Sequence, residues 1–152
     1  MLALPLAFRK RLVGNSWTGT TPGDSTINEK SKKGILVLIE PDVSVRDALT
    51  VLLEGENWRV NSLEDCHELE PVIETTGVVA VISESSLPSC TPQEIFEQCS
   101  RRGLPVIFTG HDLPLQGAVD LIRLGAMDFL DKPFPQSRLL DLLDRLCNRQ
   151  NT

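Results

Sequence analysis

Five polar residues stand close behind short apolar runs, and their types are those that phosphoryl chemistry uses. They are Glu40, Asp42, Glu84, Thr109 and Lys132. Carboxylates hold divalent cations, while an ammonium group and a hydroxyl bind phosphoryl oxygens. The same set is equally well explained if Lys132 only neutralises neighbouring acids. Spacing alone therefore leaves two interpretations open, a cation–phosphoryl site and a structural ion cluster.

The apolar runs predict buried β-strands at 35–39, 58–60, 78–82, 105–108 and 127–130. Such runs suit strands that are covered by helices on both faces. Periodicity and capping residues predict helices at 42–55, 62–75, 91–103, 113–124 and 135–148. This alternation predicts an α/β fold with a doubly wound, five-stranded parallel sheet. Ligands bind at the carboxyl edge of such sheets, where the five polar residues are expected to converge.

Three of the predicted helices carry signals that a structure can check. Asp42 is expected to cap the first helix, whose inward face we assign to Val45, Ala48, Leu49 and Leu52. On the second helix, we expect one side to face the core. It consists of Cys66, Leu69, Val72 and Ile73. The third begins at Thr91-Pro92-Gln93-Glu94, which combines a cap, a proline at the first position and a glutamate at the third.

Charge and hydropathy exclude several classes of function. The 152-residue chain has a formal net charge of −6. Residues 1–33 hold six basic and two acidic side chains, whereas the remainder holds nine basic and nineteen acidic ones. An acidic body argues against direct nucleic-acid binding. No apolar run reaches transmembrane length, and the cysteine usage predicts a reduced, cytoplasmic setting. Residues 1–33 are expected to be a disordered extension, followed by one folded domain at 34–149.

The cysteines and the first turn give mainly negative information. The four cysteines show no C-x-x-C spacing and no zinc-ligand pattern with either histidine. We expect them to be reduced, partly buried apolar residues rather than a redox switch. The turn after the first strand reads IEPD and is not glycine-rich, which argues against a nucleotide enzyme of the Rossmann or P-loop kind.

Two stretches resemble the second half of bacterial response-regulator receiver domains, the CheY-like superfamily, and its FixJ-type branch in particular. They read VIFTGHD at 106–112 and LGAMDFLDKPF at 124–134. The resemblance covers about residues 34–149. It implies a flavodoxin-like sheet with the strand order 2-1-3-4-5 and a role in two-component signal transduction.

The resemblance also implies roles for single residues. Thr109 matches the switch hydroxyl that bonds the phosphoryl group, and Lys132 matches the lysine that contacts the phosphoryl oxygens. Phe129 matches the aromatic switch residue, and the family's cis peptide bond would fall before Pro133. The family's partner surface would include a set of residues on the helix after Thr109, namely Gln116, Val119, Asp120 and Arg123.

The first half of the chain departs from the family pattern. Glu84 stands four residues before Pro88, where the family has its phospho-accepting aspartate. Glu40 matches one acid of the family's pair, but Pro41 falls where a metal ligand is expected. A misplacement of about 1 Å in a reacting group can cost ~10²-fold in rate, and a lost metal carboxylate removes charge neutralisation.

These departures predict a non-enzymatic, atypical receiver that signals through proteins without being phosphorylated. Glu84 would be a fixed charge that partly mimics the phosphorylated state, or a relic in an inactive pocket. We expect no cofactor. Mg²⁺ is the one ion that the acidic residues could still bind. Partners would be a histidine kinase, a separate output protein or a second copy bound through residues 113–149. The main alternative is a working Mg²⁺-dependent phospho-acceptor. A small hydrolase that uses Ser83, Ser85 or Ser86 with His111 is less favoured.

Overall fold

The computed structural model describes residues 32–150, so all but the last two residues of the predicted extension lie outside the described part. The strands are β1 (Ile35–Ile39), β2 (Arg59–Leu63), β3 (Val78–Glu84), β4 (Val106–Gly110) and β5 (Asp128–Asp131). The helices are α3 (Val43–Gly55), η1 (Cys66–Glu68), α4 (Leu69–Ile73), α5 (Pro92–Arg101), α6 (Leu115–Leu124) and α7 (Gln136–Gln150). The strands form one parallel sheet in the order β2-β1-β3-β4-β5. The predicted α/β fold and strand order are confirmed.

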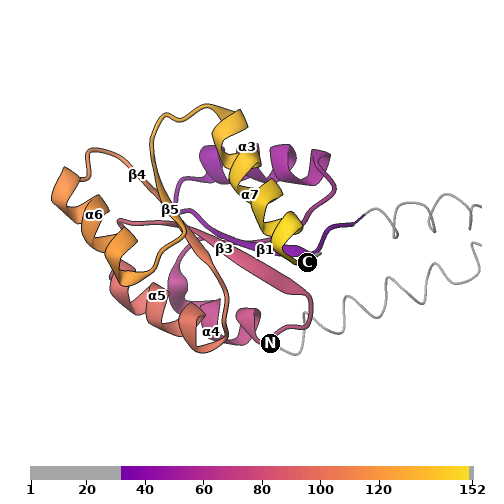
Figure 1. Cartoon of the computed structure of the whole chain (residues 1–152), viewed down its shortest axis with the longest axis horizontal. Helices are drawn as coiled ribbons and strands as arrows, with labels where there is room; N and C mark the ends of the chain where they lie inside the picture. The colour runs from indigo at the N-terminus through magenta and orange to yellow at the C-terminus, as the bar shows by residue number, and fades with distance from the viewer. Residues whose placement is uncertain (1–31, 151–152) are drawn as a thin grey trace, which may run out of the picture. The chain divides into compact units, whose positions relative to one another are not determined.

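Helices cover both faces of the sheet, as the apolar strands require. α3 and α7 lie together on one face, and α4 and α5 lie on the other (Figure 1). Alternate residues of each strand point to opposite faces, so Val37 and Val81 belong to one apolar cluster and Leu36 and Ile82 to the other. The first cluster receives side chains from α4, α5 and α6, and the second from α3 and α7. The sheet thus has two dry cores.

The strand register brings the carboxyl ends of four strands to the same level. Ile39 of β1 pairs with Ser83 of β3. Glu84 of β3 pairs with Thr109 of β4, and the next β4 residue, Gly110, pairs with Asp131 of β5. The residues that follow these pairs therefore leave the sheet side by side, which positions the site described below.

The predicted helix at 62–75 is wrong in its extent. Residues up to Leu63 continue strand β2, and the helical part is divided between the 3₁₀ turn η1 and the five-residue α4. Pro71 explains why the stretch is divided, because it has no N–H to donate to the carbonyl of His67 in η1 and its ring clashes with that carbonyl. The predicted inward side is nevertheless correct, since its four members are buried, namely Cys66, Leu69, Val72 and Ile73.

The starts of α3 and α5 confirm the predicted caps. The Asp42 carboxylate accepts hydrogen bonds from the N–H groups of Ser44 and Val45. Thr91 and Glu94 bond each other's main-chain N–H groups, which completes a capping box. One assignment on α3 is wrong: Ala48 is exposed. The buried stripe instead continues from Leu49 to Leu53, one helical turn further on.

The prediction that all cysteines are free is also wrong. Cys66, at the start of η1, and Cys90, in the loop between β3 and α5, form a disulfide. Cys99 and Cys147 are free. The bonded pair is separated by 24 residues, and only the tertiary fold brings η1 beneath the loop that follows β3.

Candidate functional site

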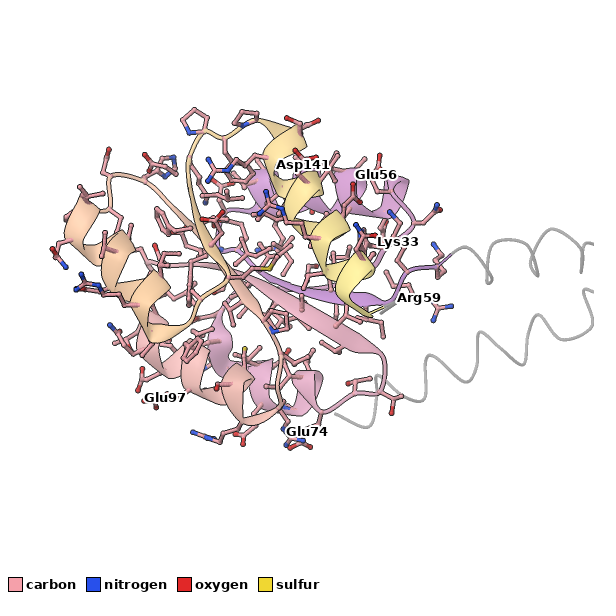
Figure 2. All side chains as sticks on the ribbon, in the orientation of Figure 1. Lys33, Glu56, Arg59, Glu74, Glu97 and Asp141 are labelled. Atoms are coloured by element: carbon pink, nitrogen blue, oxygen red, sulfur yellow. A yellow bond between two sulfur atoms is a disulfide. The ribbon has the colours of Figure 1, made fainter. Side chains whose placement is uncertain are left out.

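Lys132 joins two carboxylates at the carboxyl edge of the sheet. Its Nζ lies 2.6 Å from Oε1 of Glu40 and 2.6 Å from Oε1 of Glu84. The side chains are 9% (Lys132), 4% (Glu40) and 9% (Glu84) exposed. Charged residues on or next to the helices, such as Glu74, Glu97 and Asp141, instead lie on the outside of the molecule (Figure 2). We call Lys132, Glu40 and Glu84 the carboxylate–lysine cluster.

The other two carboxylate oxygens of the cluster are also hydrogen-bonded. Oε2 of Glu40 accepts from the N–H of Asp42 at 3.0 Å, and Oε2 of Glu84 accepts from the N–H of Ser86 at 3.1 Å. All four carboxylate oxygens therefore have a donor within the protein. Buried charges are tolerated when they are paired and hydrogen-bonded in this way.

The two carboxylates keep the lysine charged. Burial on its own lowers the pKa of Lys132, because a dry environment disfavours the ammonium form. The hydrogen bonds to Glu40 and Glu84, together with their negative charges, more than offset burial and hold the pKa of Lys132 above its ordinary value. The cluster thus contains one cation and two acidic residues that share it.

Asp42 and Pro41 add no carboxylate to the cluster. The side chain of Asp42 caps α3, and the residue is exposed. Only its main-chain N–H reaches the cluster, through Glu40. Pro41 has no side-chain donor atom. The residues present therefore do not fit the divalent-cation site that the family pattern implies, since both remaining carboxylates already bind Lys132 and a main-chain N–H.

Thr109 pairs with Glu84 in the sheet, and Phe129 lies close to Gly110, the residue after Thr109. Thr109 is buried and its main-chain oxygen accepts the N–H of Ser85 at 2.7 Å. Gly110 leaves room for the side chains of Ser85 and Phe129. A Cβ at Gly110 would lie 2.5 Å from Oγ of Ser85 and 3.3 Å from the ring of Phe129. Sequence reasoning missed Gly110 and Ser85 as packing partners, although the glycine directly after Thr109 is a visible signal of close approach.

The turn after β5 orients Lys132. Its N–H donates to the main-chain oxygen of Gly110 at 2.7 Å, which ties β5 to the end of β4. The peptide bond between Lys132 and Pro133 is cis, as the resemblance implies.

The residues assigned to a partner surface lie on α6. Gln116 donates a hydrogen bond to Asp120 at 2.8 Å, and both are exposed together with Arg123. Val119 is half-buried. Sequence reasoning missed three exposed apolar members of this helix, Leu115, Ile122 and Leu124, which are 80%, 43% and 40% exposed.

The hydrolase alternative finds no support in side-chain contacts. In the part of the chain that is described, no hydrogen bond joins His111 to Ser83, Ser85 or Ser86. Ser83 instead donates to the main-chain oxygen of Glu84 at 3.0 Å. A nucleophilic serine needs a base within hydrogen-bond reach.

Known proteins match both the sequence and the fold. A profile of the response regulator receiver domain matches residues 36–144. The transcriptional regulatory protein FixJ of Bradyrhizobium diazoefficiens is 31% identical over 116 residues, which cover 74% of this chain and 56% of that protein. The C4-dicarboxylate transport transcriptional regulatory protein DctD of Pseudomonas aeruginosa is 37% identical over 114 residues, covering 72% and 24%.

Solved structures agree on the fold. Full-length FixJ from B. japonicum superposes with a TM-score of 0.70 at 24% identity, covering 78% of this chain and 59% of that one. A receiver domain protein from Clostridium thermocellum gives a TM-score of 0.72 at 20% identity, covering 78% and 97%. No helix among residues 32–150 is long and apolar enough to cross a membrane. The profile match, the relatives and the five-stranded sheet show together that this chain belongs to the receiver domains of two-component response regulators, which are signalling modules.

Proposed function

We propose that this receiver signals by binding proteins without accepting a phosphoryl group, and that Glu84 acts as a permanent negative charge in place of a phosphoryl group. One observation carries the proposal: the ammonium group of Lys132 is already bound at 2.6 Å by Glu84 and at 2.6 Å by Glu40. In the family that ammonium group contacts phosphoryl oxygens. Here the carboxylates of Glu84 and Glu40 bind it instead.

The geometry of Glu84 supports the proposal. Phosphoryl transfer needs an acceptor oxygen that is free to attack in line with the donor. Both oxygens of Glu84 are instead fixed, one by Lys132 and one by the N–H of Ser86. An incoming phosphoryl group would have to break one of these bonds in a site that is about nine-tenths buried.

The charge of the site supports it as well. Transition states of phosphoryl transfer develop negative charge that metal ions neutralise. The turn after β1 offers Pro41 and a carboxylate engaged in capping α3, so it has no free acid for a second cation. Glu84 supplies about one negative charge, against the ≈ −1.5 to −2 of a phosphoryl group at neutral pH. The mimicry is therefore partial.

The signal would leave the domain through α6 and its neighbours. Leu115 and Ile122 expose apolar surface there, beside the polar residues Gln116, Asp120 and Arg123. We expect this surface to contact a kinase, an output protein or a second copy in a cytoplasmic pathway. Replacement Leu115→Glu should weaken that contact in sedimentation or pull-down measurements. The equivalent change Val51→Glu, at a 71% exposed valine of α3, serves as the matched control.

The central test is incubation of the full chain with acetyl phosphate and Mg²⁺, followed by intact-mass measurement. We expect no gain of a phosphoryl group. Mg²⁺ with beryllofluoride, a phosphoryl mimic, should leave the amide resonances of Thr109 and Phe129 unshifted. A mass gain in the wild type would overturn the proposal. If the gain disappeared in Glu84→Gln, Glu84 would be the acceptor, and if it persisted, the acceptor would be another residue.

A further inference from the structure

The loop of residues 85–91 follows Glu84 directly and is fastened at both of its ends. At its start, Ser85 donates its N–H to the main-chain oxygen of Thr109, and Ser86 donates its N–H to Glu84. At its end, Cys90 is bonded to Cys66, and Thr91 caps α5. The conformation of this loop and the position of the Glu84 carboxylate are therefore linked through the Ser86 N–H.

At the Cys90 end of the loop, several contacts join residues 65–67 to residues 89–90. Besides the disulfide, the hydroxyl of Ser89 donates to Oδ2 of Asp65 at 2.8 Å and lies 3.2 Å from Nε2 of His67. The other oxygen of Asp65 accepts the N–H of Cys66 at 2.7 Å. We call this group, Asp65, Cys66, His67, Ser89 and Cys90, the η1 junction. Its covalent bond is the only one of these contacts that a thiol reagent can open.

The two cysteines of the junction differ in exposure. Cys66 is 5% exposed and belongs to the apolar core, whereas Cys90 is half-buried. Exchange between a thiol and a disulfide requires that a thiolate reaches one sulfur, and Cys90 offers that sulfur. The free Cys99 is fully buried, and burial raises its pKa to about 12, so Cys99 does not compete as an attacking thiolate.

We propose that Cys66 and Cys90 form a reversible redox switch, which holds the 85–91 loop against η1 when oxidised and releases it when reduced. Disulfides that serve in reducing compartments are usually transient and redox-sensing. The switch would therefore add a redox input to the pocket of Glu84. Only this last consequence rests on the proposed function, because the release of the loop is independent of phosphorylation and of any partner.

The chemical step is thiol–disulfide exchange with a cellular thiol or dithiol. A thiolate of the reductant attacks Cys90 Sγ, a new S–S bond forms, and the bond between the two cysteines breaks. Cys66 leaves as a thiolate and takes up a proton. A second thiol of the reductant then attacks the mixed disulfide, which frees Cys90 as a thiol and leaves the reductant as a disulfide. Two electrons pass to the protein, and a disulfide oxidant reverses the exchange.

Release would act on the loop without unfolding the domain. The hydrogen bonds of Ser89 remain after reduction, but they are exposed and exchange readily with water. Leu87 and Cys90 pack only partly buried against the core on the α5 side. Local opening of a segment held by so few contacts costs less free energy than global unfolding.

The test is amide hydrogen exchange of the full chain, oxidised and then reduced with dithiothreitol. We expect amides between Ser86 and Cys90 to exchange about tenfold faster or more after reduction, because local opening becomes easier. Amides of β4 should remain much better protected than those of the loop, because they open only when the whole domain unfolds. Alkylation after denaturation should label two of the four cysteines in the oxidised protein and all four in the reduced one.

Matched variants separate the disulfide from other effects of the reductant. The double variant Cys66→Ser/Cys90→Ser should exchange like the reduced wild type in both buffers, while Cys99→Ser should keep the full difference. Equal loop exchange in oxidised and reduced wild type would overturn the proposal. So would complete loss of protection throughout the sheet on reduction, since the domain would then need the bond to stay folded, and so would alkylation of all four cysteines without reductant.

Discussion

The two ends of the 85–91 loop are fixed by different kinds of chemistry. At the Glu84 end, Lys132 neutralises two buried carboxylates and main-chain N–H groups satisfy the remaining oxygens. At the Cys90 end, a covalent bond and the exposed contacts of Ser89 hold the loop to η1. The first fastening is electrostatic, and all four of its carboxylate oxygens accept hydrogen bonds. The disulfide at the Cys90 end can be opened by reduction.

This difference indicates how the domain could carry a signal without phosphorylation. A buried polar network whose every oxygen is satisfied is rigid and favours one arrangement. A disulfide next to it has two chemical states under conditions that cells can produce. Under the two proposals above, the site that other receivers use for phosphorylation is a fixed structural element here, and the input acts at the opposite end of the same loop.

Removal of the lysine is expected to have the largest effect. Lys132→Met leaves Glu40 and Glu84 buried beside each other without a cation. Breaking a buried ion pair from one side typically costs about 3–5 kcal/mol. Urea unfolding at neutral pH should therefore show a loss of that size in the free energy of unfolding. The double variant Lys132→Met/Glu84→Gln should recover part of the loss, because one uncompensated charge is gone.

The pH dependence of stability checks the same interaction without a mutation. Because the pKa of Lys132 in the folded protein lies above its ordinary value of 10.5, its stabilisation is complete below that pH. It is lost as the pH rises through the folded-state pKa. The wild type should therefore lose stability in alkaline solution more steeply than Lys132→Met, which contains every other lysine. Parallel profiles would show that the cluster is not an ion pair in solution.

Reduction of the disulfide is expected to have the next largest effect on global stability. The bond closes a loop with a sequence separation of 24 residues, and such cross-links typically stabilise by about 2–4 kcal/mol, mainly by restricting the unfolded chain. The free energy of unfolding from urea titrations should fall by this amount with dithiothreitol. Domains of this size commonly have about 5–15 kcal/mol in total, so the reduced protein should stay folded. The variant Cys66→Ser/Cys90→Ser should show no response to the reductant.

The contrast between the two fastenings also separates what the sequence predicts from what it does not. Glu84, Thr109 and Lys132 were expected at one sheet edge, because strands in a parallel sheet end together and each residue follows an apolar run. That expectation needs only the strand order. The sequence does not decide between a phosphoryl site and an ion cluster, since the choice depends on where the Lys132 side chain points, and spacing carries no such information.

Asp42 illustrates a conflict that the sequence could not resolve. It was expected both to cap α3 and to join the acidic pocket, but one short carboxylate serves one of these roles, and here it caps the helix. The Cys66–Cys90 bond was missed for another reason. Its geometry depends on the later end of β2, at Leu63, and on the division of the following helical stretch into η1 and α4. Neither cysteine stands in a spacing pattern that would identify its partner.

The smallest expected effect concerns Ser89, which holds the η1 junction without a covalent bond. Burial alone would raise the pKa of Asp65, but the N–H of Cys66, the hydroxyl of Ser89 and the charge of His67 together hold it below its ordinary value of 3.8. Ser89→Ala removes one of these donors, so the pKa of Asp65 should move up towards 3.8 in an NMR titration. The stabilisation from Asp65 is present above that pH and is lost as the pH falls through the folded-state pKa.

At neutral pH, Ser89→Ala should lower the free energy of unfolding by only about 0.5–1 kcal/mol, the usual net value of one hydrogen bond. Ser100→Ala, at an exposed serine of α5, is the matched control and should change neither quantity. The comparison is sharpest in the reduced protein, where the hydroxyl of Ser89 is the remaining side-chain tie between the loop and η1. There Ser89→Ala should speed amide exchange of the loop beyond the effect of reduction alone. If it does so equally in the oxidised protein, the disulfide is not the dominant fastening at this end.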